Sequence, residues 1–410
     1  MADHLFAEQR GEGATYRRAT LKKFTDLVSA DNDFPLADFG SRQSASSEAI
    51  GYGKSLMLFH MVRRTLGDQA FLLALSLLAE DYRYAPAAFG DLAGEFTAAT
   101  GQEWGEYFEA WTTRAGAPRL EIASHSLEPG EPAPDQPGWV LEVRLRQAQE
   151  EDPFPVTVPV AITLEGVDRA MWADVEMEGR EGVLEMRTPA RPLRVDVDPL
   201  FDIMRRLDPM EVPPALSTVF GEDDPLFVLP SAASPEEQEA WRALAEGWRQ
   251  GKGARSVLDS ELTALPEEAA WILGWDNRHL GALAARLSPQ EVSRTADGLA
   301  LGEERYGRKN HSVVLTTRAE SDPAVAIGWV GADPVAAVPG LMRKLPHYTR
   351  YSYLAFRGEE PTNVAKGMWE PSGSPLTLKL GDGPLPAFRP PKRSALMELP
   401  SPFDGERLLR

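Results

Sequence analysis

The stretch that decides the fold of the first part of the chain is GYGKSLMLFHMVRRTLG, residues 51–67. Its apolar residues recur at the spacing of one helix face, namely Leu58, Met61, Val62 and Leu66. Gly67 supplies a helix stop, and Asp68 supplies an N-cap for a following helix. The stretch therefore predicts a buried helix that ends at residue 66 or 67.

The polar start of this helix is where we expect chemistry. Tyr52 and Lys54 alternate there with Gly51 and Gly53. Glycine adopts backbone angles that other residues rarely adopt, so a neighbouring side chain can be held in an unusual direction. We take Tyr52 as the candidate catalytic residue, with Gly51 and Lys54 as neighbours in a substrate cleft. The alternative is a glycine-flanked helix start with a buried tyrosine.

The run Tyr52-Gly53-Lys54-Ser55, followed by an apolar helix and Leu66-Gly67-Asp68, resembles the aminopeptidase N (membrane alanyl aminopeptidase) family of gluzincin zinc metallopeptidases. That family carries Tyr-x-Lys-Gly here, so Ser55 departs from the motif. The similarity continues through Phe71, Asp91-Leu92, Phe96, Gly101, Phe108, Trp111 and Ala117-Pro118. The resemblance implies that Tyr52 hydrogen-bonds the oxyanion of a tetrahedral intermediate.

Zinc ligands of the kind that this family uses are not found in the sequence. The family holds zinc with His-Glu-x-x-His on one helix and a glutamate on the next. The six histidines are His4, His60, His125, His279, His311 and His347, and no two of them lie within one helical turn. We therefore expect zinc in the complete family enzyme and none bound by this chain alone. Residues 1–8 resemble the segment after the third zinc ligand, which favours a fragment or a degenerate homologue.

Composition narrows the function classes further. The 410 residues carry 43 Lys and Arg against 62 Asp and Glu, a formal net charge of -19, which disfavours binding to nucleic acid. No cysteine is present, so disulfides and cysteine metal sites are excluded. No apolar run reaches membrane-spanning length. We expect a soluble, bacterial-type protein and leave its compartment open between cytoplasm and periplasm.

Hydrophobic periodicity predicts a multidomain α+β protein. Helical spacing dominates 1–118, and alternation with a period of two follows, as in 139–145 and 156–164. We predict the helical part of a peptidase-like catalytic domain at 1–118, a β-sandwich at 119–198, an α/β domain at 199–383 and a proline-rich tail at 384–410. The resemblance also implies a β-sandwich after the catalytic domain.

The α/β domain is predicted from strands that alternate with helices, which favours a parallel or mixed sheet. The strands are 226–229, 256–258, 270–274, 312–316, 325–330 and, as the last, 351–356; the helices are 235–248, 277–287 and 334–345. No glycine-rich nucleotide motif or Gly-x-Ser-x-Gly elbow accompanies them. A basic and aromatic cluster spans 343–353, and Asn363, Lys366 and Trp369 are expected in the following loop. The cluster is expected either to pack internally or to meet an acidic ligand or partner domain.

Three functions remain open. The first is the C-terminal portion of a zinc-dependent aminopeptidase, which hydrolyses N-terminal residues from peptides when joined to its missing zinc-binding segment and is inactive alone. Its partners are then the peptide substrate and the missing N-terminal part of the same protein. The second is a catalytically inactive homologue that acts as a protein-binding scaffold. The third is a structural or envelope module that resembles a peptidase only in its helix packing.

Overall fold

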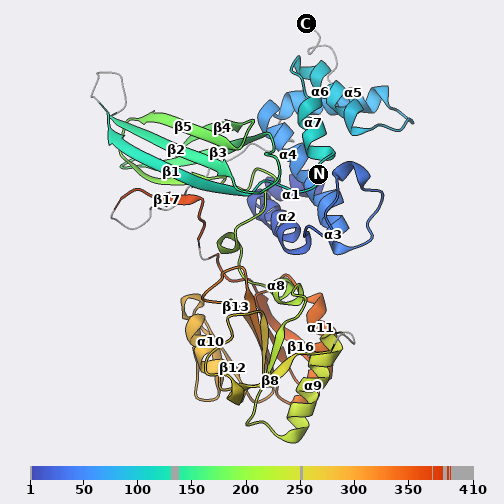
Figure 1. The fold of residues 1–410 in the computed structure, drawn as a ribbon, viewed down its shortest axis with the longest axis vertical. Helices are drawn as coiled ribbons and strands as arrows, with labels where there is room; N and C mark the ends of the chain where they lie inside the picture. Colours follow the sequence, from blue (N-terminus) through green and yellow to red (C-terminus); the bar gives the residue numbers. More distant parts are fainter. Residues whose placement is uncertain are drawn as a thin grey trace. The chain divides into compact units, whose positions relative to one another are not determined.

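The computed structural model describes residues 2–130, 138–249, 253–371, 373–381, 386 and 388. The chain is a mixed α+β protein with two compact units (Figure 1). The first unit comprises Met1–Asp208 and Ser374–Arg410, and the second comprises Pro209–Gly373. This division differs from the predicted one, because the helices and the first two sheets share one unit. The predicted tail at 384–410 lies outside the described residues, apart from 386 and 388.

The first unit opens with seven α-helices. They are α1 (Ala2–Gln9), α2 (Gly13–Leu27), α3 (Ala45–Glu48), α4 (Ser55–Leu66), α5 (Asp68–Asp81), α6 (Phe89–Thr100) and α7 (Gly105–Thr112). The predicted helix at 51–67 is confirmed as α4, whose Leu58 and Val62 are fully buried. Gly101 ends α6 in the left-handed conformation, as a C-terminal glycine commonly does. The aromatic residues that follow, Trp104, Phe108 and Trp111, are buried in the core.

Two antiparallel sheets complete the first unit. One has the strand order β1-β2-β5, with β1 (Leu120–Pro129), β2 (Trp139–Gln147) and β5 (Glu181–Thr188). The other has the order β17-β6-β3-β4, with β3 (Val156–Leu164), β4 (Met171–Met177), β6 (Pro192–Val197) and β17 (Thr377–Lys379). Gly182 of β5 lies against Val175 and Met177 of β4, where a Cβ atom would come within 2.7 Å of both side chains. The predicted change from helical to strand periodicity after residue 118 is confirmed.

Side chains join the helices of this unit to the segments that flank the strands of its second sheet. The Trp111 ring of α7 lies 4.7 Å from the Phe154 ring, centre to centre, and its indole N–H donates to Pro155 O at 3.0 Å. On α4, His60 bonds the carboxylate of Asp202, which follows the last strand of the predicted sandwich. The border at residue 118 therefore separates two kinds of secondary structure within one core, because buried aromatic and ionic contacts cross it.

The second unit is built on a seven-stranded mixed sheet of order β16-β15-β13-β14-β9-β7-β8. The strands are β7 (Leu226–Leu229), β8 (Ser256–Leu258), β9 (Ala270–Leu273), β13 (His311–Arg318), β14 (Ala326–Gly331), β15 (Tyr353–Arg357) and β16 (Thr362–Gly367). β14, β9, β7 and β8 run parallel, whereas β13 pairs antiparallel with β14 and β15. The prediction of a mixed α/β sheet is confirmed for this part of the chain.

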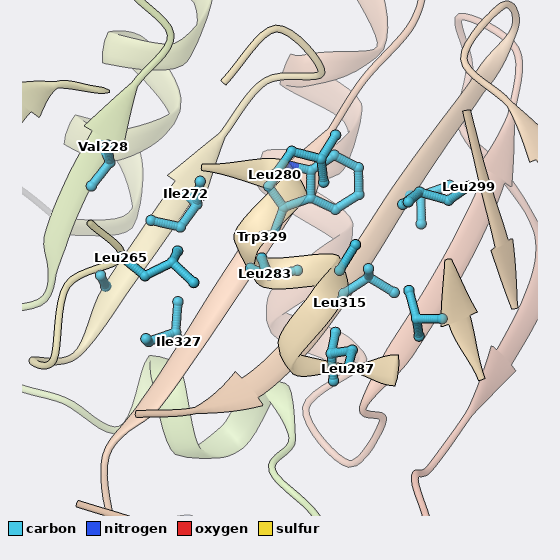
Figure 2. Close-up of a cluster of buried hydrophobic side chains, with 14 of the residues drawn as sticks. Val228, Leu265, Ile272, Leu280, Leu283, Leu287, Leu299, Leu315, Ile327 and Trp329 are labelled. Atoms are coloured by element: carbon cyan, nitrogen blue, oxygen red, sulfur yellow. The ribbon is translucent and has the colours of Figure 1, made fainter. Parts of the chain in front are cut away.

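Helices cover both faces of this sheet. One face packs against α10 (Leu280–Arg286), and Figure 2 shows Leu280 and Leu283 gathered with Ile272, Leu315 and Trp329 of the strands. The other face packs against α8 (Leu216–Phe220), α9 (Pro235–Arg249) and α11 (Val338–Lys344). A small sheet follows α10, with β10 (Val292–Arg294), β11 (Gly298–Leu301) and β12 (Glu304–Gly307).

Two expectations for the end of this unit are corrected. Tyr351–Phe356 was expected as the last strand, yet β16 follows it and forms one edge of the sheet. Asn363 and Lys366 therefore lie in a strand and not in a loop, because their backbone pairs with β15. Trp369 is buried, and its indole N–H donates to Thr316 O at 2.8 Å. No helix among the described residues has the length and apolar character needed to cross a membrane.

Candidate active site

Tyr52 lies on a π-helical turn, Ala49–Lys54, that leads directly into α4. Ser44 caps the preceding short helix α3, since its hydroxyl accepts the Ser47 N–H at 3.0 Å. π-Helical turns are rare and occur often at functional sites. The Tyr52 side chain is 59% exposed, so the alternative prediction of a buried tyrosine is wrong. No hydrogen bond to its hydroxyl occurs within the described part of the chain.

Phe39 supports Tyr52 from the side. The two rings meet edge to face, with centres 5.4 Å apart. The Phe39 ring also packs onto the backbone of Gly51, where a Cβ atom would come within 2.3 Å of the ring. Gly51 is therefore needed for close packing immediately before Tyr52, and its predicted place in a substrate cleft remains a prediction. The ring of Phe39 restricts the positions that the tyrosine can adopt.

Lys54 is fully buried, although the sequence suggested a place in the cleft. Its ammonium donates to Arg114 O at 2.7 Å and to Gly116 O at 3.0 Å, and it lies 5.5 Å from the centre of the Phe154 ring. Burial lowers the pKa of Lys54 to about 8. Its two carbonyl partners hold the segment after α7 against the start of α4. Lys54 is thus committed to internal contacts.

A buried polar cluster that the sequence did not predict surrounds Glu8. His4 and Glu8 lie four residues apart on α1, and His60 lies on α4. One ligand atom from each of the three lies within 4.8 Å of the other two, a geometry that warrants a test for metal binding. The i,i+4 spacing of His4 and Glu8 was a visible signal, but only the tertiary structure adds His60.

Arg17 is bonded to two of the three candidate metal ligands of this cluster. Its Nη1 lies 3.0 Å from His4 Nε2 and 3.2 Å from Glu8 Oε1. Arg63 adds a second guanidinium, 2.6 Å from Glu8 Oε2. Zinc binds such nitrogen and oxygen ligands at about 2.0–2.2 Å, so a guanidinium this close excludes it by both volume and charge. The residues do not fit a resident zinc ion in this arrangement.

The protonation states of the two histidines in the cluster follow first from their burial and then from the charged groups around them. Because arginine only donates, His4 Nε2 must accept from Arg17, and burial together with neighbouring His60 lowers the pKa of His4 to about 3. Burial also lowers the pKa of His60, although its hydrogen bond to Asp202 opposes this effect. Asp202 accepts from His60 Nε2 at 2.8 Å and lies 2.9 Å from Arg17 Nη2. The cluster is a neutral histidine pair within a network of ion pairs.

Comparison with known proteins finds short sequence matches to aminopeptidases. Alanine/arginine aminopeptidase of Saccharomyces cerevisiae is 31% identical over 78 residues, which is 19% of this chain and 9% of that protein. Aminopeptidase N of Lactococcus lactis subsp. lactis is 34% identical over 70 residues, 17% of this chain and 8% of that protein. The matches therefore span less than a tenth of these relatives. No family model matches the chain.

A solved structure gives a weaker likeness. The crystal structure of Legionella pneumophila aminopeptidase A in complex with aspartic acid aligns with 51% of this chain and 23% of its own, at 16% identity and a TM-score of 0.32. A score of this size carries no argument about the fold. The two sequence matches confirm the predicted resemblance to aminopeptidase N over a short segment of the chain.

Proposed function

We propose that this chain is the C-terminal portion of an aminopeptidase N-like metallopeptidase that removes N-terminal residues from peptides. Its helical part then belongs to the catalytic domain. The observation that carries the proposal is the exposed hydroxyl of Tyr52, presented by a π-helical turn inside a Tyr-x-Lys motif. The sequence matches to aminopeptidases support it from outside the structure.

Tyr52 is proposed to stabilise the oxyanion that forms when a peptide carbonyl is attacked. A phenol O–H that donates to this oxygen interacts more strongly with the developing negative charge than with the neutral carbonyl, and it thus lowers the barrier. The hydroxyl needs a fixed position to act in this way. Phe39 and the turn at the start of α4 restrain the ring, while the exposed side chain leaves the hydroxyl free.

Zinc is proposed as a cofactor of the complete enzyme and is assigned to no residue of this sequence. The sequence has no His-Glu-x-x-His motif, and Arg17 is bonded to both His4 and Glu8 of the His4, Glu8 and His60 cluster. A zinc-binding segment must then join this chain, covalently or as a separate piece. Peptides are its proposed substrates.

The test compares turnover of an aminoacyl-arylamide by this chain alone and by this chain with a zinc-binding segment from an aminopeptidase N. We expect activity only in the joined protein. There, Tyr52→Phe should reduce kcat by about 100- to 1,000-fold with the zinc content unchanged, as loss of one oxyanion donor does. Tyr84→Phe is the matched control, because Tyr84 is a fully exposed tyrosine of the same unit. Near-normal turnover of the Tyr52→Phe protein would remove Tyr52 from the mechanism.

A second candidate is a catalytically inactive homologue that serves as a protein-binding scaffold. The contacts of Arg17 with His4 and Glu8 favour it, because a guanidinium this close to two of the three candidate ligands opposes metal binding at this cluster. The same assay separates the two functions. A joined protein that binds zinc but remains inactive, with Tyr52 intact, favours the scaffold.

A further inference from the structure

Two cationic side chains of the second unit meet at a phenol. Arg350 Nη2 donates to the Tyr351 hydroxyl at 2.6 Å, and the guanidinium carbon lies 4.8 Å from the centre of the Tyr351 ring. Lys366 Nζ lies 5.5 Å from the centre of the same ring. Arg350 and Lys366 are exposed, and Tyr351 is partly buried between them and the sheet. The three side chains therefore form one small basic and aromatic surface.

Neither cation is neutralised by a carboxylate within the part of the chain that the structure describes. Other arginines of this unit do form such ion pairs, as in Arg249–Asp224, Arg255–Glu268, Arg286–Glu267 and Arg308–Asp276. Carboxylates are also abundant, since the whole chain has a net charge of -19. The absence of an acidic partner at this surface is thus not explained by a shortage of acidic residues. It leaves two positive charges directed at solvent.

The backbone holds this surface in place. The carbonyl of Tyr351 accepts the Leu216 N–H at 3.0 Å, and the carbonyl of Thr349 accepts the Ser217 N–H at 2.7 Å. Lys366 lies in β16, paired with Leu354 of β15. Arg350 and Lys366 are therefore anchored by a hydrogen-bonded turn and by a strand, respectively. A ligand that bound both cations would spend little free energy on ordering the backbone.

The phenol contributes a third donor. Arg350 donates to the lone pairs of the Tyr351 oxygen, so the hydroxyl proton remains free to donate to another group. The hydrogen bond from Arg350, assisted by Lys366, lowers the pKa of Tyr351. A more acidic hydroxyl is a stronger donor to a negatively charged acceptor.

We propose that Arg350, Tyr351 and Lys366 bind one oxyanion group, a phosphate or a carboxylate, of a small molecule. A guanidinium, an ammonium and a phenol O–H supply the charged and neutral donors that such a group accepts. The acidic field of the chain disfavours long polyanions such as nucleic acids, so a single anionic group fits better. This site is independent of the proposed peptidase function.

The experiment is a calorimetric titration of the full chain at low ionic strength, with inorganic phosphate and, separately, with acetate. We expect saturable binding of one anion per chain with a Kd of about 1 mM, as suits a small exposed site. Arg350→Ala and Lys366→Ala should each raise the Kd at least about 10-fold. Arg343→Ala is the matched control, since Arg343 is an exposed arginine of the same unit. A melting temperature equal to wild type shows that each variant is folded.

A second readout is specific to the site. A bound anion neutralises the two cations, so the pKa of Tyr351 should rise toward its ordinary value. The difference absorbance of tyrosinate should report this rise in the wild-type protein but not in Tyr351→Phe. Phosphate binding without acetate binding identifies a phosphate group, and the reverse identifies a carboxylate. Binding that is unchanged in both alanine variants, or no saturation by either anion up to about 10 mM, overturns the proposal.

Discussion

Replacement of His4 by glutamine should weaken the dependence of stability on pH. His4 is completely buried, and its pKa is lowered from 6.5 to about 3 by burial, by His60 and by the nearby arginines. Between these two values the unfolded chain binds a proton on this residue and the folded chain does not. Acid therefore favours the unfolded chain, and the stabilising effect of neutral His4 is lost as the pH falls below 6.5.

The magnitude follows from proton linkage. One proton changes the free energy of unfolding by about 1.4 kcal/mol per pH unit, so His4 accounts for about 4 to 5 kcal/mol over the whole window. His60 acts in the same direction, because its pKa is also lowered. Asp198 acts in the opposite direction up to a pH of about 6, because burial raises its pKa to that value. The His4 contribution is isolated by comparing a variant with wild type.

The assay is urea unfolding followed by circular dichroism at several pH values between about 7 and 4. His4→Gln keeps an oxygen that can accept a hydrogen bond from Arg17, but glutamine does not titrate. The free energy of unfolding of both proteins should decrease as the pH falls, and the decrease should be smaller in the variant than in wild type by about 1.4 kcal/mol per pH unit. His125→Gln is the control, since His125 is exposed on β1 of the same unit and should leave the slope unchanged. Equal slopes for His4→Gln and wild type would refute the reasoning.

Three further results are expected. Asp202→Asn should lower the free energy of unfolding by about 1 to 3 kcal/mol, because it removes the charged acceptor shared by buried Arg17 and His60 while Glu8 still pairs with Arg17. Asp174→Asn, at a half-exposed ion pair, should lower the free energy of unfolding by less than about 1 kcal/mol in the same urea titration. Gly51→Ala should lower the free energy of unfolding, measured by thermal melting, by about 1 to 3 kcal/mol, because the added Cβ would meet an aromatic ring at 2.3 Å. Gly53→Ala should lower it by less, because its Cβ would meet only a methyl group, at 3.3 Å. Limited proteolysis should release 209–373 as a stable piece; a first cut inside its central strands would contradict the two-unit division.

The sequence alone determined much of the secondary structure. The helix α4, the start of strands after residue 118 and the strand and helix alternation of 226–356 were all predicted from periodicity, because the spacing of apolar residues depends only on neighbours along the chain. Turn and cap residues indicated where helices end, as Gly101 does after α6. Of the candidate site, the sequence supplied Tyr52 through its motif and the prediction that a helix begins beside it.

Only the tertiary structure decided which distant segments meet. Lys54, expected in a cleft, lies in the core, Arg17 contacts both His4 and Glu8, and Lys366 belongs to an edge strand. The tertiary structure also paired β17 with β6, so that Thr377 lies opposite Asp196 in one sheet of the first unit. Periodicity indicates which face of a helix or strand is buried. It does not indicate which residues cover that face, because they come from a remote part of the chain. The identity of these partners depends on the packing of the whole unit.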